Sequence, residues 1–266
     1  MASEIVIKDA GNGQPWLVMV HGMSQDHRVF SAQLETFKDQ YRILLVDLPG
    51  HGLASGTGGP FGHVEMAAHV EHAITANGAD NVCYWGTHTG ATIGLYLAGT
   101  SPGLISALIL EGPLVPGANP PVVVGTIDRA RATARASGVA AALDQWWRDS
   151  CWFEYMQAHP QACRAAEHLA IIKDFTGRPW LDDLSPQAID NAEELLSRIR
   201  IPALIYNGAA DHGDFLAAAG HIRDLLGDAR MEVVSEAGGF PAWENPGAAN
   251  RLAADFLGQP NPTSID

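Results

Sequence analysis

The sequence has few cysteines. Its 266 residues include only three, Cys83, Cys151 and Cys163, and their spacing matches no metal-ligand motif. Any disulfide would leave one thiol unpaired, so we expect all three to be reduced, which is typical of a cytoplasmic protein. The segment Met1–Gln14 contains no apolar core, so the sequence shows no secretory signal either. Together these absences predict a cytoplasmic protein.

Positive charge is also scarce. The 16 lysines and arginines are outnumbered by 30 aspartates and glutamates, which gives a formal net charge of −14 at pH 7. Since nucleic-acid binding needs a basic face, this balance argues against a nucleic acid as partner, and it disfavours an anionic membrane surface. No run of about 18 apolar residues occurs, so we expect no membrane span. A small-molecule substrate is the expected partner, and the oligomeric state is left open.

What the sequence does contain is a series of short apolar runs. Hydrophobic residues make up 47% of the chain, too many for intrinsic disorder. Six runs are continuous rather than alternating, which indicates strands buried on both faces, as in a parallel sheet covered by helices. The segment Glu4–Ile7, before Gly11-Asn12-Gly13, predicts half of an antiparallel hairpin at the sheet edge. The six runs are Trp16–Val20, Arg42–Asp47, Asn81–Tyr84, Ile105–Leu110, Pro202–Tyr206 and Met231–Val234.

Helical patterns alternate with these strands, which predicts an α/β protein with a doubly wound, mostly parallel sheet. Residues 113–197 break the alternation, because they are Ala-rich, helical in period and without a good strand. We predict an inserted helical cap there, and a core formed by residues 1–112 and 198–266. The predicted helices of the core are Phe30–Lys38, His63–Ala76, Thr89–Leu97, Phe215–Leu225 and Ala248–Phe256.

One segment carries the strongest signal for chemistry. In Tyr84-Trp85-Gly86-Thr87-His88-Thr89-Gly90-Ala91, an apolar strand is joined to a helix through small residues on both sides of His88. This is the pattern of the nucleophile elbow G-x-S-x-G, a strained turn that lifts its central side chain above the sheet.

Four further segments follow predicted strands and extend the pattern. In order and spacing, the chain resembles the α/β-hydrolase superfamily, of the lactonase, haloperoxidase-like and C–C hydrolase type. The resemblance covers nearly everything outside the cap, and it implies the α/β-hydrolase fold. The four segments are Val20-His21-Gly22-Met23, Asp47-Leu48-Pro49-Gly50-His51-Gly52, Asn207-Gly208-Ala209-Ala210-Asp211 and Ala237-Gly238-Gly239-Phe240-Pro241.

The sequence departs from the family at two of the three triad positions. The elbow residue would be serine, and here it is His88. The last-strand motif would be G-H-F-P, and here Gly239 stands in place of the histidine. Only the acid, Asp211, keeps the expected type. A serine acyl-enzyme mechanism is therefore excluded, and a natural or an engineered replacement would fit the sequence equally well.

One hypothesis explains both departures from the family pattern. The imidazole of His88 would extend into the space vacated at Gly239 and meet Asp211, which would fix its tautomer and raise the basicity of the other ring nitrogen. By the resemblance, the backbone N–H groups of Met23 and Thr89 would form an oxyanion hole, which stabilises developing negative charge. The predicted catalytic residues are thus His88 and Asp211.

Four further residues are predicted to bind substrate. His27 lies in a D-H-R run that resembles one in cofactor-independent dioxygenases of this fold. Glu111 ends a strand at the carboxyl edge of the sheet, where ligands bind in open α/β sheets. The aromatic cap segment contains Trp147 and Trp152, which we expect to roof the pocket over a small, largely apolar substrate. The histidines of the helix His63–Ala76 are interpreted as a solvated face, and we expect no metal and no organic cofactor.

The leading prediction is an enzyme that acts on a small carbonyl compound, an ester, lactone or diketone, with His88 as general base. Two alternatives are left open. One is non-hydrolytic, cofactor-free chemistry on the same fold, by a lyase, decarboxylase, isomerase or dioxygenase. The other is a catalytically inactive hydrolase that binds a small ligand.

Overall fold

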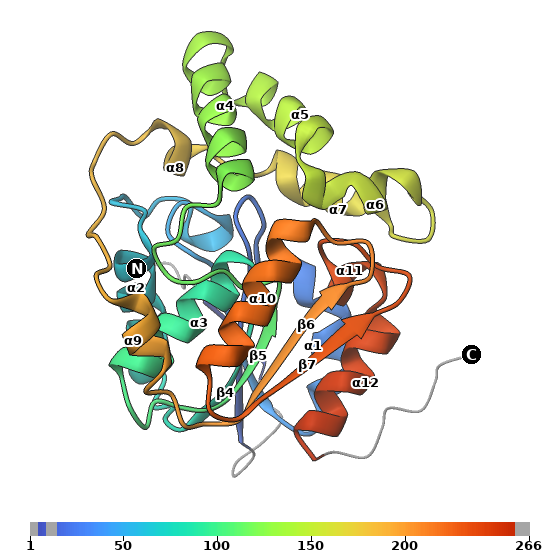
Figure 1. Ribbon diagram of the computed structural model, residues 1–266. Helices are drawn as coiled ribbons and strands as arrows, with labels where there is room; N and C mark the ends of the chain where they lie inside the picture. The colour runs from blue at the N-terminus through green and yellow to red at the C-terminus, as the bar shows by residue number, and fades with distance from the viewer. Residues whose placement is uncertain (1–4, 9–14, 259–266) are drawn as a thin grey trace.

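The computed structural model describes residues 5–8 and 15–258. They form a seven-stranded sheet in the order β1-β3-β2-β4-β5-β6-β7 (Figure 1). Strand β1 pairs antiparallel with β3, and every other neighbouring pair is parallel. The strands are β1 (Ile5–Lys8), β2 (Trp16–Val20), β3 (Arg42–Val46), β4 (Val82–Thr87), β5 (Ile105–Glu111), β6 (Ala203–Gly208) and β7 (Ala229–Val234).

The predicted doubly wound, mostly parallel sheet is confirmed. The edge strand differs in one respect, because β1 pairs with β3 and does not form a hairpin with β2, the next strand in the chain. Glu4 and the predicted turn Gly11-Asn12-Gly13 lie outside the described residues. The strand predicted to end at Tyr84 continues to Thr87, because the small residues before the elbow still pair with β5.

Both faces of the sheet are buried, which explains the continuous apolar runs. In β2, Leu17 and Met19 pack into one hydrophobic core, while Val18 and Val20 pack into another on the opposite face. The first core is covered by α1 (Ser31–Phe37) and α12 (Pro246–Phe256). The second is covered by α2 (His63–Ala76), α3 (Thr89–Thr100) and α10 (Gly213–Leu225).

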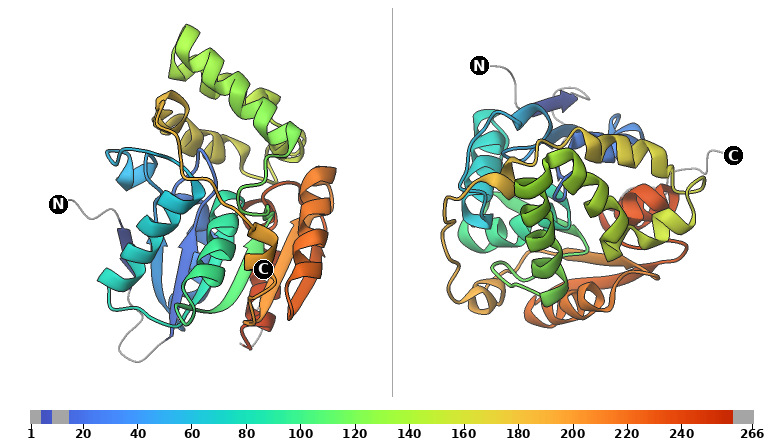
Figure 2. Two further views of the ribbon diagram at one scale, coloured as in Figure 1. Left: turned by 60° about the vertical axis from the view of Figure 1, so that its left-hand side comes forward. Right: turned by 90° about the horizontal axis from the view of Figure 1, so that it is seen from above.

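A group of helices lies above the carboxyl ends of the strands (Figures 1 and 2). Seen from above, α4 and α5 cross the end of the sheet. Helix α9 instead packs against α3, with the Leu195 side chain against Gly99. The division into a core and a cap insertion at residues 113–197 stays a prediction. These elements are α4 (Pro121–Ser137), α5 (Val139–Asp149), η3 (Cys151–Phe153), α6 (Glu154–Ala158), α7 (Ala165–Lys173), α8 (Arg178–Leu181) and α9 (Ala192–Leu196).

Three shorter elements complete the fold: η1 (His27–Phe30), η2 (Gly52–Ala54) and α11 (Pro241–Glu244). Within the described residues, no helix combines the length and the apolar character needed to cross a membrane.

Candidate active site

His88 stands on a strained turn between β4 and α3. Its backbone has φ 46° and ψ −107°, a left-handed conformation that a residue with a side chain rarely adopts. The turn needs glycine on both sides. A Cβ on Gly86 would fall on the backbone of Gly90 and Ala91, and one on Gly90 would fall on the Val20 carbonyl. The sequence thus folds into a tight strand–turn–helix unit that raises the His88 side chain at the sheet's carboxyl edge.

The imidazole of His88 is held by one hydrogen bond and two aromatic rings. Its Nε2 lies 2.6 Å from the carbonyl oxygen of Gly239, and because a carbonyl only accepts, the ring proton is on Nε2. The ring centroids of Phe215 and Phe240 lie 5.0 and 4.5 Å away. Gly112, with φ 54°, lies against the ring, and a Cβ there would come within 3.1 Å of Cε1.

The other ring nitrogen of His88 is available for chemistry. Within the described residues, Nδ1 has no hydrogen-bond partner, and it is not among the atoms that are sealed in without one. Burial lowers the pKa of His88 below its ordinary value of 6.5, although the Asp211 charge and the Gly239 carbonyl act in the opposite direction. The ring is therefore neutral at pH 7, and Nδ1 presents a lone pair.

Asp211 is buried near His88 but does not bond to it. Its two carboxylate oxygens accept from Asn207 Nδ2 and from the backbone N–H of His212, each at 2.8 Å. Among the described residues, no hydrogen bond joins Asp211 to His88, so the direct contact predicted from the sequence is not present. The carboxylate is occupied by nearer donors, and the Gly239 carbonyl orients the ring instead. Burial raises the pKa of Asp211, while the nearby His88 opposes this shift.

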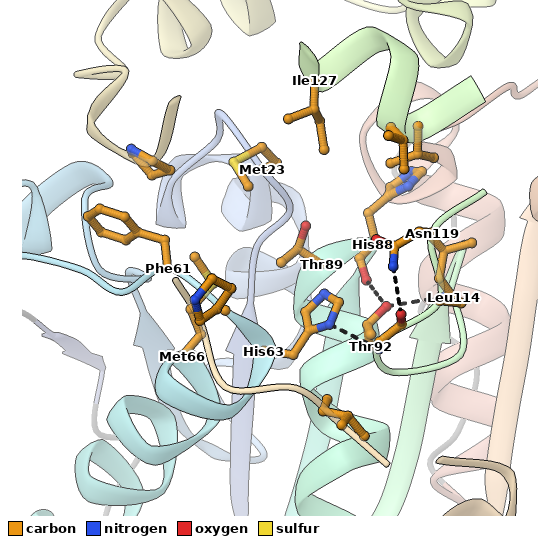
Figure 3. Close-up of a pocket in the computed structure, with 18 of the residues that line it drawn as sticks. Met23, Phe61, His63, Met66, His88, Thr89, Thr92, Leu114, Asn119 and Ile127 are labelled. Atoms are coloured by element: carbon orange, nitrogen blue, oxygen red, sulfur yellow. Dashed lines mark hydrogen bonds between the residues drawn. The ribbon is translucent and has the colours of Figure 1, made fainter. Parts of the chain in front are cut away.

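His88 lines a cavity of about 430 Å³, which is also lined by residues of α4, α5 and α8. Figure 3 shows His88 on its wall with Met23, Thr89 and Thr92. Most lining side chains are apolar, from Phe61 and Met66 on one side to Ile127 of α4. Within the described residues, the lining includes no serine and no cysteine, and Arg131 is its only cation at neutral pH. A neutral imidazole therefore faces an apolar space that has no serine or thiol nucleophile.

Comparison with known proteins identifies the architecture. The family model of the α/β-hydrolase fold matches residues 15–151, just over half of the chain. The chain belongs to the α/β-hydrolase family. It is 26% identical over 254 residues to 2-succinyl-6-hydroxy-2,4-cyclohexadiene-1-carboxylate synthase of Yersinia pseudotuberculosis, covering 92% of this chain and 88% of that protein. It is 34% identical over 97 residues to pimeloyl-[acyl-carrier protein] methyl ester esterase of Xylella fastidiosa, covering 36% of each.

Two solved structures superpose on nearly the whole chain. MenH from S. aureus matches with a TM-score of 0.81 at 20% identity, covering 96% of this chain and 98% of that chain. The enol-lactonase from Burkholderia xenovorans matches with a TM-score of 0.82 at 20% identity, covering 96% of each. At this identity the likeness shows the fold alone, and it confirms the fold expected from the sequence.

The α/β-hydrolase pattern places the oxyanion turn at Val20–Met23, and the structure brings it to His88. Met23 and Thr89 both line the cavity beside His88, and the role of their N–H groups stays a prediction. Gly22 packs close to His88, because a Cβ on Gly22 would lie 3.3 Å from the His88 Cβ. Two consecutive hydrogen bonds, which the sequence did not suggest, hold the turn. Gly22 N donates to Gln25 Oε1, and Gln25 Nε2 donates to His168 Nε2 of α7, each at 3.0 Å.

The two tryptophans predicted to roof the pocket have different outcomes. Trp152 lines the cavity. Trp147 does not, and packs instead on Phe153 with ring centroids 4.9 Å apart. Neighbouring residues on a helix differ in direction by about 100°, and the inward face of α5 carries Ala142, Leu143 and Trp146. Trp146, which does line the cavity, was recognisable from that spacing.

His27 is not part of the cavity lining, and its predicted contact with substrate stays a prediction. Its Nδ1 lies 2.8 Å from Asp47 Oδ2, and its backbone N–H donates to Asp47 Oδ1 at 2.7 Å. The hydrogen bond to Asp47 raises the pKa of His27, although burial opposes the shift. His27 therefore stabilises the loop after β3, because its backbone N–H and its Nδ1 both bind the Asp47 carboxylate.

Glu111 is also outside the lining of the large cavity, and its predicted binding role stays a prediction. Its side chain is fully buried, and Oε2 accepts from the Ala242 backbone N–H at 2.6 Å. Burial raises the pKa of Glu111 to about 8, so the carboxyl is protonated at neutral pH. It ties the end of β5 to α11.

Replacing Glu111 by glutamine tests this assignment. The pKa of Glu111 rises from an ordinary value of 4.5 to about 8 in the fold. The stability contributed by its proton is therefore complete below pH 4.5 and is lost as the pH rises through 8. Glutamine stays neutral, so we expect similar melting temperatures for variant and wild type at about pH 5, and a variant several degrees more stable at about pH 8.5. An equal difference at both pH values in thermal unfolding would contradict this assignment.

Proposed function

We propose that this protein is an enzyme that acts on a small, largely apolar carbonyl compound (an ester, lactone or diketone), with His88 Nδ1 as general base. The observation that carries the proposal is the position of a neutral imidazole on the elbow, anchored through Nε2 and open through Nδ1 to an apolar cavity. The esterase and the synthase among the relatives support carbonyl chemistry.

In the hydrolytic reaction, Nδ1 of His88 takes a proton from a water molecule whose oxygen attacks the substrate carbonyl carbon. The carbonyl electron pair moves onto the oxygen, which accepts from the N–H groups of Met23 and Thr89. Collapse of this intermediate breaks the bond to the leaving oxygen, which receives the proton from Nδ1. General-base catalysis contributes about 10²–10⁴-fold, and each oxyanion donor about 3 kcal/mol.

Two partners stabilise the imidazolium that forms in this step. The Gly239 carbonyl accepts from Nε2, and the charge of the buried Asp211 favours the protonated ring. Asp211 thus acts on His88 through space, while the Gly239 carbonyl fixes the tautomer.

A second candidate is abstraction of a proton from a carbon next to the carbonyl, as in lyase, decarboxylase, isomerase or cofactor-free oxygenase chemistry. The absence of serine and cysteine from the described cavity lining favours it, because a base and an oxyanion hole suffice to form an enolate. Incorporation of deuterium from D2O into a ketone substrate, without cleavage, would distinguish this reaction from hydrolysis.

The first test is turnover of 4-nitrophenyl acetate and of the lactone dihydrocoumarin by the wild-type protein between about pH 4.5 and 9. We expect saturable, multiple turnovers without a burst, and an acid limb whose apparent pKa lies below 6.5, because burial lowers the pKa of His88. A rate that does not saturate and only matches free histidine at equal concentration would contradict hydrolysis. Thermal stabilisation by these compounds without turnover would favour the inactive binding protein.

Replacing Asp211 by asparagine tests its electrostatic role. The charge of Asp211 raises the pKa of His88, so its removal should move the acid limb of kcat/KM to lower pH. Asparagine keeps the size of the side chain, and a flip of the Asn207 amide, whose Oδ1 has no partner, can pair with it. We expect a rate at pH 8 within about tenfold of the wild type. An unmoved limb in the pH profile would show that Asp211 does not act on the base.

A further inference from the structure

A second histidine faces the cavity and has no role in the mechanism above. His63 is the first residue of α2, is half-buried and lines the same cavity as His88. Figure 3 shows its ring on the cavity wall, in a view that also draws His88, Thr89 and Thr92. The sequence pattern places His63 on a solvated helix face, because the loop that covers it, around Gly117, is distant in the sequence.

The hydrogen bond of His63 fixes which end of its ring carries the proton. The backbone N–H of Gly117 donates to His63 Nδ1 at 3.3 Å, so the proton of the neutral ring is on Nε2. Burial lowers the pKa of His63, although Glu65 acts in the opposite direction. Its place in the first turn of a helix also favours the neutral ring. Within the described residues, Nε2 has no partner and is not sealed in, so it presents an N–H to the cavity.

The two cavity histidines therefore share a tautomer but expose opposite ends. His88 gives its N–H to the Gly239 carbonyl and exposes a lone pair, whereas His63 accepts from Gly117 and exposes an N–H. A base and a neutral donor in one cavity form a pair of complementary groups. A neutral histidine near a helix N-terminus can polarise a carbonyl oxygen by donating a hydrogen bond to it, as triosephosphate isomerase does.

We propose that His63 Nε2 donates a hydrogen bond to a second oxygen of the substrate, beyond the carbonyl that reacts at His88. This deepens the proposed function and rests on it: the substrate is a keto ester or a 1,3-diketone. An apolar substrate with one carbonyl would leave the His63 N–H desolvated and unpaired, which is costly in an apolar cavity. A site built to donate to a substrate oxygen discriminates strongly against an analogue that lacks it.

The competing role for His63 is structural, as a tie between α2 and the loop at Gly117. Two conservative variants separate the roles. His63→Asn places an acceptor near the position of Nδ1, which keeps the tie to Gly117, but offers no donor at the position of Nε2. His63→Gln places an amide N–H near the position of Nε2. His72→Gln, on the exposed face of the same helix, is the matched control.

The probes are ethyl acetoacetate and ethyl butyrate, which differ by one ketone oxygen. We expect His63→Asn to lower kcat/KM for ethyl acetoacetate by about 10- to 100-fold, and to change that for ethyl butyrate by less than about threefold. His63→Gln should retain most of the preference, and His72→Gln should change neither rate. Equal losses of kcat/KM on both esters, or an unchanged kcat/KM for ethyl acetoacetate in His63→Asn, would overturn the assignment of His63. Either result would leave the proposed function intact.

If the wild type hydrolyses neither ester, the proposed hydrolysis fails, and the donor is tested by binding. In protein labelled with ¹⁵N-histidine, the ring spectrum should show the His63 proton on Nε2, and ethyl acetoacetate should shift that resonance while ethyl butyrate does not. A proton on Nδ1, or equal responses to both compounds, would overturn the assignment of His63.

Discussion

Replacing His88 by alanine is expected to lower kcat/KM for esters and lactones by about 10²–10⁴-fold. The expectation follows from the position of Nδ1, the unpartnered ring nitrogen that faces the cavity, on a ring that is neutral at pH 7. The loss should fall on kcat more than on KM, because the base acts in the transition state and the apolar walls that bind substrate remain. Steady-state kinetics on 4-nitrophenyl acetate and dihydrocoumarin measure both parameters.

His88→Gln is the informative companion to the alanine variant. Its amide N–H can still reach the Gly239 carbonyl, so the anchoring contact is kept while the basic nitrogen is lost. We expect it to be as inactive as His88→Ala. His72→Ala controls for background cleavage, since the chain has eleven histidines and imidazole cleaves activated esters. Variants of His88 that turn over as fast as the wild type would remove the general base and leave hydrolysis without support.

We expect the variant with serine at position 88 to be inactive. The serine mechanism needs an imidazole within hydrogen-bond reach to take the hydroxyl proton, and position 239 provides only a backbone carbonyl to the elbow. We therefore expect His88→Ser to behave like His88→Ala and to show no acyl-enzyme burst. The imidazole at the elbow is then itself the catalytic group.

The fold was predictable because its signals are local. Burial on both faces of the sheet makes the runs at β2, β3 and β5 continuously apolar, and the pattern can be read without knowing the partners of each strand. The elbow was predictable for a similar reason, since Gly86 and Gly90 are needed where two backbones meet. The pairing of β1 with β3 was not predictable, because it joins two strands that are not consecutive in the sequence.

The partners of the site residues were harder to predict, because each depends on a tertiary contact. Asp211 and His88 come near one another, but the hydrogen bond of His88 goes to a backbone carbonyl, which has no signature in the sequence. His27 is held by Asp47, 20 residues away, and His63 by the backbone of Gly117. Residue type predicted which side chains can do chemistry, whereas the loops that pack around them decide which of them reach the cavity.

The second large effect is expected at Gly239, where the family pattern has histidine. A Cβ on Gly239 would lie 2.5 Å from the carbonyl oxygen of Trp152 and 2.9 Å from its Cβ. Trp152 has no room to withdraw, because it is buried and packs on Trp146 and Phe215 with ring centroids 5.0 and 6.1 Å apart. We expect Gly239→His to destabilise the fold by about 3 kcal/mol, which lowers the melting temperature by roughly 5 °C in a chain of this size.

Three further variants locate the cause of that loss. Gly220→Ala, in α10 with open space around the added Cβ, should be neutral or slightly stabilising, whereas Gly239→Ala should already destabilise. Trp152→Ala should not rescue Gly239→His, because the nearest atom is the backbone oxygen of Trp152 and remains in place. A Gly239→His protein as stable as the wild type would show that the segment around Trp152 can move away from position 239 at little cost in stability.

The same contact decides whether a serine triad can be rebuilt in this chain. His88→Ser with Gly239→His restores both residue types, yet the new imidazole would have to occupy space next to the Trp152 backbone. We expect this double variant to unfold at a lower temperature and to form no acyl-enzyme. In this chain Gly239 is held by two neighbours, because the segment of η3 that contains Trp152 packs against its Cα and His88 donates to its carbonyl. A burst of product from the double variant would show instead that the two triad positions are independent of the segment above them.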